Sequence, residues 1–261
     1  MTELLNMVQC CPRLAGLERS RWWLDGLRQA ISWLRTCSLA GVSKLLRRLG
    51  IVYKRGREYV HSPDPDYKLK LAYLAAARAQ VHARPQHQVM RYLDEMTYTR
   101  RPSVGYDYAP RRSKRPLARL GWGTNCQRRI AGALDVETGR FITWQRSRFD
   151  RRNLLAFFRA LQAAYPYAER IFLVLDNWPV HFHPDILLAL ANSNITLLRL
   201  PTYAPWTNPV EQVWRRLRQE VLHLHDFLED WSALQTMVQR WLDQWRDGSL
   251  ALLHYVGLLP N

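Results

Sequence analysis

The chain has 261 residues, a hydrophobic fraction of 48% and 11 Trp, which exclude a disordered protein and predict one sizeable domain with a smaller unit attached. Lys and Arg total 38 against 22 Asp and Glu, and the resulting charge of +16 indicates a polyanionic partner. Nucleic acid is favoured over a membrane surface, because the basic residues are spread along the whole chain. The four Cys form no CxxC pair and no apolar run approaches the roughly 20 residues that span a bilayer, so a reduced, cytoplasmic protein is expected.

The first 60 residues have the pattern of a small DNA-binding unit. Apolar residues recur at helical spacing in residues 19–34 and again in residues 38–50, with Gly50 as a stop signal. Two helices with a short break predict a helix-turn-helix. Residues 51–60, "IVYKRGREYV", alternate around a basic Gly turn and predict a small hairpin or wing.

Basic side chains are frequent on the second helix and on this hairpin. A solvated surface explains such a set equally simply, but in a strongly basic protein a helix followed by a basic hairpin favours contact with DNA phosphates. The expected DNA-binding residues are Lys44, Arg47, Arg48, Lys54, Arg55 and Arg57.

Acidic residues and prolines in "VHSPDPDY" interrupt the Arg-rich pattern and predict the domain boundary. Residues 61–86 are expected to form a linker and a connecting helix, and residues 87–261 a second domain. Its pattern is a strand over 87–95, a hairpin whose turn contains Gly139, and then alternating helices and strands. This order predicts an α/β, ribonuclease H-like fold with a mixed sheet and helices on both faces.

Three acids occupy comparable places in this second domain. Asp94 is predicted to end the first strand, Asp176 ends the central buried strand "IFLVLD", and Glu211 opens a late helix. Because ligand sites of open sheets lie beyond the carboxyl ends of the strands, Asp94 and Asp176 are expected to lie close together. An Asp at a strand end can also be only a turn or helix cap, so neither acid is decisive alone.

Close carboxylates repel one another unless a proton or a cation lies between them. Hard oxygen ligands favour Mg²⁺ or Mn²⁺. With Glu211 as a third ligand, two ions about 3.5 to 4 Å apart are expected, an arrangement suited to phosphodiester transfer. The alternative for Glu211 is structural: Asn208 as N-cap, Pro209 in the first helical position and Glu211 in the third resemble a capping box.

The blocks "LDEMTYTR", "LVLDNWPVHFHP" and "LPTYAPWTNPVEQVWRRLRQEV" resemble the signature blocks of bacterial insertion-sequence transposases related to mariner, in the insertion sequence six-thirty group of the DDE superfamily. The 34 residues between Asp176 and Glu211 match the spacing typical of mariner-like elements. The resemblance extends to "LLRRLGIVYKRGREYVHSPDPDY" and "LLHYVGL", and so covers most of the chain.

This resemblance implies that Asp94, Asp176 and Glu211 are the catalytic, metal-binding triad. It implies hydrolysis of a DNA strand at the element end and attack of the freed 3′ hydroxyl on target DNA, at TA sites in mariner-like relatives. Glu95 points to the opposite side of the strand and is not expected to be a ligand. Supporting roles are expected for Asn177, Asn208 and His181, and phosphate binding for Arg215 and Arg218.

Because pairing two element ends generally demands at least a dimer, a homodimer is expected on DNA. The expected location is the bacterial cytoplasm, with the protein at the nucleoid when it is bound to DNA. The competing function is a truncated, inactive protein that only binds element ends, because relatives often carry two helix-turn-helix units where about 60 residues stand here. A purely structural, ribosome-associated protein fits the charge but leaves the three acids unexplained.

Overall fold

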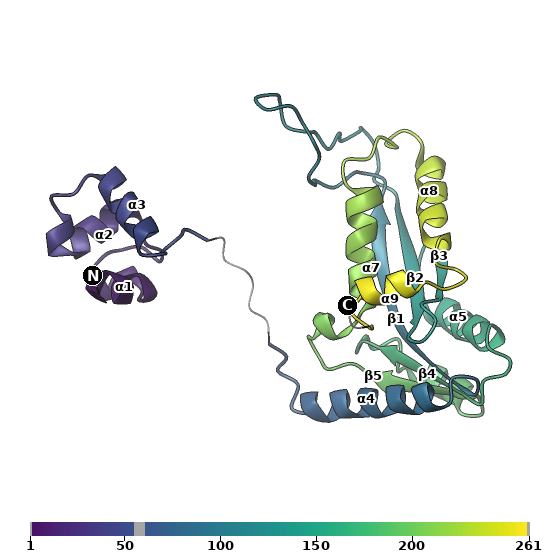
Figure 1. Cartoon of the computed structure of the whole chain (residues 1–261). Helices are drawn as coiled ribbons and strands as arrows, with labels where there is room; N and C mark the ends of the chain where they lie inside the picture. The colour runs from purple at the N-terminus through teal and green to yellow at the C-terminus, as the bar shows by residue number, and fades with distance from the viewer. Residues whose placement is uncertain (1, 55–60, 260–261) are drawn as a thin grey trace. The chain divides into compact units, whose positions relative to one another are not determined.

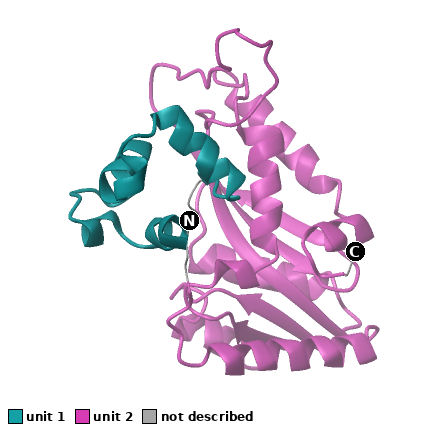
Figure 2. Ribbon diagram, turned by 60° about the vertical axis from the view of Figure 1, so that its left-hand side comes forward, with its two compact units in different colours: residues 1–59 teal, residues 60–261 magenta. Residues whose placement is uncertain are grey.

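The computed structural model describes residues 2–54 and 61–259. These residues form two compact units, Met1–Tyr59 and Val60–Asn261, shown in different colours in Figure 2. The expected hairpin over 51–60 falls mostly outside the described residues, and so do Arg55 and Arg57. Residues 51–54 contain no strand. None of the described helices is both long and apolar enough to cross a lipid bilayer.

The N-terminal unit is helical, as the apolar spacing predicts. Its helices pack around a small core of Leu4, Leu27, Ile31, Leu34 and Val42. The expected helix over 19–34 is shorter in the structure, because Ile31 adopts an extended conformation and a 3₁₀ turn follows it. The elements are α1 (Thr2–Gln9), a 3₁₀ turn (Pro12–Ala15), α2 (Leu24–Ala30), a second 3₁₀ turn (Ser32–Leu34) and α3 (Leu39–Arg48).

The second helix of the predicted helix-turn-helix begins and ends as its sequence signals indicate. Ser38 is the N-cap of α3, and its Oγ accepts a hydrogen bond from the Gly41 backbone N at 3.1 Å. Gly50 follows the helix with a φ of +72°, a left-handed conformation that glycine adopts without a steric penalty.

The larger unit is built on a five-stranded mixed sheet with the order β3-β2-β1-β4-β5 (Figure 1). β1 pairs antiparallel with β2 and parallel with β4, and β5 pairs parallel with β4. This confirms the predicted ribonuclease H-like order of a hairpin followed by alternating helices and strands. The strands are β1 (Gln88–Thr99), β2 (Gln127–Asp135), β3 (Phe141–Arg146), β4 (Arg170–Leu175) and β5 (Ile195–Arg199).

Helices cover both faces of the sheet, and each face has its own apolar core. Because strand side chains alternate, Met90, Tyr92 and Met96 of β1 face one core while Val89 and Leu93 face the other. The first core contains α4 (Tyr67–Ala83), α7 (Val210–Leu217), α8 (Trp231–Asp243) and α9 (Leu250–Tyr255). The second contains α5 (Arg151–Ala163) and α6 (Pro184–Leu190).

The hairpin between β2 and β3 turns at Gly139, as predicted. Its φ is +69°, and a Cβ there would lie 2.2 Å from the Ser249 carbonyl oxygen. Only glycine therefore fits this turn. Asp135 stabilises the same turn, because its Oδ1 accepts hydrogen bonds from the backbone N atoms of Glu137 and Thr138 at 3.0 and 2.9 Å.

The first strand differs from its prediction at its C-terminal end. β1 continues to Thr99 instead of ending at Glu95, because Met96–Thr99 pair with the start of β2 across a long loop. Asp94 therefore lies within the strand, and the prediction that it ends the strand is wrong. Pairing of β1 with β4 stops at Tyr92, so Asp94 still lies just beyond the carboxyl end of the parallel part of the sheet.

Candidate functional site

Asp94 faces the core that contains α7. It shares the face of Tyr92 and Met96, and the residue is only 8% exposed. Its Oδ2 accepts a hydrogen bond from the indole Nε1 of Trp214 at 3.0 Å. Trp214 is fully buried, so the packing of α7 on the sheet fixes one oxygen of this carboxylate.

Asp176 is the first residue after β4, at the carboxyl end of the central parallel strands. Its Oδ1 accepts a hydrogen bond from the Trp178 backbone N at 3.0 Å, and the same oxygen lies 3.0 Å from His181 Nδ1. Roughly half of the Asp176 side chain is exposed. The turn after β4 therefore orients one carboxylate oxygen and leaves the group accessible.

Glu211 opens α7, but the helix starts one residue later than the cap reading predicts. Pro209 is the N-cap and Glu211 the second helical residue, so the assignment of Asn208 as N-cap and Glu211 as the third residue is wrong. The 3₁₀ turn Pro205–Thr207 precedes the helix, and the Asn208 backbone N donates to the Pro205 oxygen. In a capping box the Glu211 carboxylate would accept a hydrogen bond from the Asn208 backbone N. That N already donates to the Pro205 carbonyl oxygen, so this contact of a capping box is lost.

The three acids line one cavity of about 330 Å³. The loop from Leu200 to Asn208 forms much of its wall, with Asn177 and Trp178 on the Asp176 side. In the part of the chain that the structure describes, no three His, Cys, Asp or Glu side chains stand close enough together to enclose a metal ion as they are placed. The carboxylates thus share one cavity without forming a closed ligand shell.

The acids affect one another electrostatically. Burial raises the pKa of Asp94 to about 8, and the neighbouring charges of Glu211, Glu95 and Asp176 add to the rise. The pKa of Asp176 is lowered: burial opposes this shift, but hydrogen bonds from His181 and from the Trp178 backbone outweigh it. The cavity therefore contains one readily ionised carboxylate beside one that holds its proton near neutral pH.

His181 lies between two acids and is completely buried. Its Nε2 is 3.1 Å from Glu95 Oε1, and its Nδ1 is 3.0 Å from Asp176 Oδ1. Burial would lower the pKa of His181, but the hydrogen bonds to Asp176 and Glu95 raise it to about 10. Glu95 points away from the Asp94 face, as strand alternation predicts, yet it reaches the site through this imidazolium. Nothing in the local sequence indicates that link.

The two asparagines expected to support the acids make hydrogen bonds to the segments around the cavity. Asn177 Nδ2 donates to the Leu200 carbonyl oxygen at 2.7 Å and contacts Thr202 Oγ1 at 3.4 Å. Asn208 is buried, and its Oδ1 accepts from the Val210 backbone N at 3.2 Å. Both residues line the cavity and fix its wall, and neither has a described hydrogen bond to the three acids.

The basic residues of the prediction are exposed wherever the structure describes them. Arg215 and Arg218 lie four and seven residues after Glu211, on the exposed side of the helix and of the π-helical turn (Arg218–Leu222) that extends it. In the N-terminal unit the exposed basic residues of the predicted set are Lys44, Arg47, Arg48 and Lys54.

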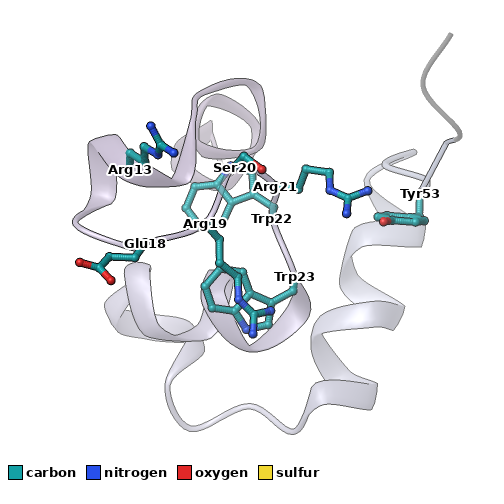
Figure 3. Close-up of a pocket in the computed structure, with 8 residues that line it drawn as sticks. All are labelled: Arg13, Glu18, Arg19, Ser20, Arg21, Trp22, Trp23 and Tyr53. Carbon is teal, nitrogen blue, oxygen red and sulfur yellow. The ribbon is translucent and has the colours of Figure 1, made fainter.

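A basic hollow of about 560 Å³ lies in the N-terminal unit, and most of its lining residues are not among the predicted DNA-binding residues. Figure 3 shows arginines beside the rings of Trp22, Trp23 and Tyr53, with Arg21 extending toward Tyr53. The Arg19 guanidinium lies over the ring of Trp23, 4.2 Å from its centre. Its lining residues are Arg13, Glu18, Arg19, Ser20, Arg21, Trp22, Trp23 and Tyr53.

Comparisons with known proteins agree with this geometry. The family model described as DDE superfamily endonuclease matches residues 89–235, which include all three acids. The Insertion element IS630 uncharacterized 39 kDa protein of Shigella sonnei is 28% identical over 237 residues, 90% of this chain and 68% of the relative.

Solved structures support the fold. The Mos1 mariner paired end complex with Mn has a TM-score of 0.70 at 16% identity, covering 100% of this chain and 75% of that chain. The Mos1 Strand Transfer Complex has a TM-score of 0.64 at 17% identity, covering 98% and 73%. The family match spans more than half of the chain, and the chain therefore belongs to the DDE superfamily endonuclease family.

Proposed function

We propose that this DDE endonuclease cuts DNA at the ends of an insertion element and joins the freed 3′ hydroxyl to target DNA. The observation that carries the proposal is the shared cavity of Asp94, Asp176 and Glu211, contributed by a central strand, by the end of its parallel neighbour and by α7. Carboxylates from three separate elements beside an open hollow suit phosphodiester chemistry better than they suit helix capping.

The residues fit a divalent cation. The raised pKa of Asp94 reflects its burial and the nearby negative charges of Glu211, Glu95 and Asp176. Mg²⁺ or Mn²⁺ bound by Asp94, Asp176 and Glu211 would relieve this repulsion. Such an ion supplies positive charge that activates the attacking oxygen and stabilises the leaving oxygen. We propose two ions, which Asp94, Asp176 and Glu211 would hold.

Neighbouring side chains prepare the acids for this role. Trp214 donates a hydrogen bond to one oxygen of Asp94. The charged His181 keeps Asp176 ionised, and the second partner of His181 is Glu95, which points away from the Asp94 face of β1. Arg215 follows Glu211 by one helical turn on exposed surface, so its guanidinium is available to a DNA phosphate close to the cavity. Arg218 extends the same basic edge.

The N-terminal unit is proposed to bind element ends. α3 presents Lys44, Arg47 and Arg48 to solvent, as a recognition helix must. The basic hollow around Arg19 and Arg21 adds positive charge that can contact the phosphate backbone, and the ring of Trp23 holds the Arg19 guanidinium by a cation–π contact.

Three further properties are proposed from the family resemblance. They are insertion at TA dinucleotides, a homodimer on paired ends, and action at the bacterial nucleoid. Sequencing of new insertion sites checks the first, and the mass of a cleaved end complex checks the second.

The decisive experiment compares the parent with Glu211→Gln on DNA that carries the element's terminal repeats, with Mg²⁺ or Mn²⁺. The substitution keeps size and removes charge. We expect the variant to fold and bind DNA but not to cut, while Glu229→Gln, an exposed acid outside the cavity lining, cuts like the parent. Equal cleavage by Glu211→Gln contradicts a ligand role. A parent that binds without cutting supports the competing function, an inactive end-binding protein.

A further inference from the structure

The segment before α4 is packed against the loop that forms the wall of the acid cavity. Thr202, in that loop, is held from both sides of its backbone by this segment. Its N donates to Asp64 Oδ2 at 2.7 Å, and its carbonyl oxygen accepts a hydrogen bond from Ser62 Oγ. The segment before α4, which the sequence predicts to be a linker, is therefore part of the larger unit.

Asp64 is the centre of this contact. Its side chain is 3% exposed, and Lys70 Nζ donates to the same Oδ2 at 2.6 Å. Oδ1 accepts from the Asp66 backbone N at 3.0 Å. The hydrogen bond from Lys70, followed by that from Thr202, holds the pKa of Asp64 well below its ordinary value. The carboxylate is thus a fixed anion whose two oxygens are both engaged.

The loop held by Asp64 needs such support. Tyr203, directly after Thr202, has a φ of +51°, a conformation that costs free energy in a residue with a side chain and persists only where its surroundings impose it. The loop runs from the end of β5 to Asn208 and forms the cavity wall. Glu211 follows three residues later.

Thr202 also connects to the Asp176 side of the cavity. Its Oγ1 is 3.4 Å from Asn177 Nδ2, which donates to the Leu200 oxygen as well. A second contact supports the docking, because Trp206 Nε1 donates to the hydroxyl of Tyr67, the first residue of α4, at 3.2 Å. The segment before α4 and the first residue of α4 thus each contact the loop, which leads to Glu211 and contacts Asn177, the residue after Asp176.

We propose that Asp64 is a positioning residue for DNA cleavage, because it fixes Thr202 and with it the loop that sets Glu211 relative to Asp176. This inference rests on the proposed function. Asp64 does not touch the cavity itself, so its effect is expected on the rate of the bound complex and not on the affinity for DNA.

The test uses the full chain with Asp64→Ala, Asp64→Asn and the matched control Asp66→Ala, an exposed acid two residues away. We measure the single-turnover cleavage rate at saturating DNA and Mn²⁺, the Kd for end DNA and the thermal midpoint. Asp64→Ala is expected to slow cleavage at least about tenfold, with a Kd within about twofold of the parent. Asp64→Asn is expected to recover part of the rate, since its amide oxygen can still accept from Thr202. Asp66→Ala is expected to match the parent.

The inference is overturned if Asp64→Ala cuts at the parent rate, or if its loss appears entirely in the Kd for DNA. If Asp64→Ala does not fold, Ser62→Ala tests the same loop through the Thr202 oxygen, and an unchanged rate overturns the inference. The parent and Glu211→Gln are measured in parallel. A parent that does not cut contradicts the proposed function, whereas a cutting parent with an equally active Asp64→Ala contradicts the positioning role alone.

Discussion

The indole Nε1 of Trp214 donates a hydrogen bond to Asp94 Oδ2 at 3.0 Å inside the core between α7 and the sheet. Trp214 lies three residues after Glu211 on the same helix. One helix therefore supplies one acid of the cavity and holds another, so a shift of α7 would move Glu211 and disturb the hydrogen bond to Asp94.

Trp214→Phe is expected to slow cleavage and to destabilise the fold. It removes the donor and leaves a buried acceptor short of a partner, at a cost of about 1 to 3 kcal/mol in unfolding free energy. The matched control is Trp241→Phe, whose indole donates to Glu220 Oε2 at 2.8 Å, away from the three acids. Urea unfolding and single-turnover cleavage check both variants. Equal cleavage by the two variants contradicts a role of Trp214 in orienting Asp94.

The stability of the metal-free protein is expected to fall as the pH rises from about 4 to 8. Asp94 has a pKa raised from 3.8 to about 8, so the folded protein keeps a proton that the unfolded chain has lost in this range. Because the folded state binds more protons there, the contribution of Asp94 to the unfolding free energy decreases with rising pH up to about 8, and His181, with a pKa raised from 6.5 to about 10, extends the decrease above that pH. Urea unfolding in the presence of a chelator across this range measures the slope.

Asp94→Asn isolates this effect, since an amide mimics the protonated acid. At pH 8 without metal the variant is expected to be more stable than the parent, and the difference is expected to shrink toward pH 4. Added Mn²⁺ is expected to raise the thermal midpoint of the parent more than that of the variant. Equal stability of the two proteins at pH 8 refutes the raised pKa.

A double-mutant cycle on His181 and Glu95 tests the buried charge pair. Breaking such a pair by removing one partner costs about 3 to 5 kcal/mol, because the other charge stays buried. His181→Gln and Glu95→Gln are each expected to be destabilising, and the double variant less so than their sum. Urea unfolding should give a coupling above about 1 kcal/mol, whereas additivity within about 0.5 kcal/mol contradicts the pair.

The basic hollow of the N-terminal unit makes a prediction about salt. If Arg19 and Arg21 bind phosphates, replacing both with Ala lowers the slope of log K against log salt by about 2, since each phosphate contact contributes about 0.9. Arg28→Ala is the control, because Asp25 already pairs with that guanidinium at 2.9 Å. Binding to end DNA at several salt concentrations gives the slopes. A slope unchanged from the parent excludes the hollow from the DNA interface.

The order of helices and strands in the catalytic unit could be predicted because its apolar blocks are local and well separated. "IFLVLD" is a strand with an acid at its end in any compact fold of this order, and the structure places Asp176 there. The end of β1 could not be predicted. Met96–Thr99 pair with residues beyond a long loop, and a non-local pairing of this kind leaves no pattern in the strand itself.

The contacts around the acids could not be predicted from the sequence for the same reason, because they join residues that are far apart in the chain. Trp214 has the spacing of a core residue and is one, but its indole also reaches an acid far away in the chain. His181 and Glu95 meet only because β1 and the turn after β4 are neighbours. Asp64 looks like part of a boundary, since nothing nearby reveals that its partner is Thr202.

The order of the three acids along the chain also governs when cutting can begin in a living cell. During synthesis the ribosome releases Asp94 first, then Asp176, and Glu211 only with α7 near the end of the chain. A polypeptide that ends before Glu211 therefore lacks the full set of carboxylates, and on the proposed function it cannot nick the chromosome beside which it is made.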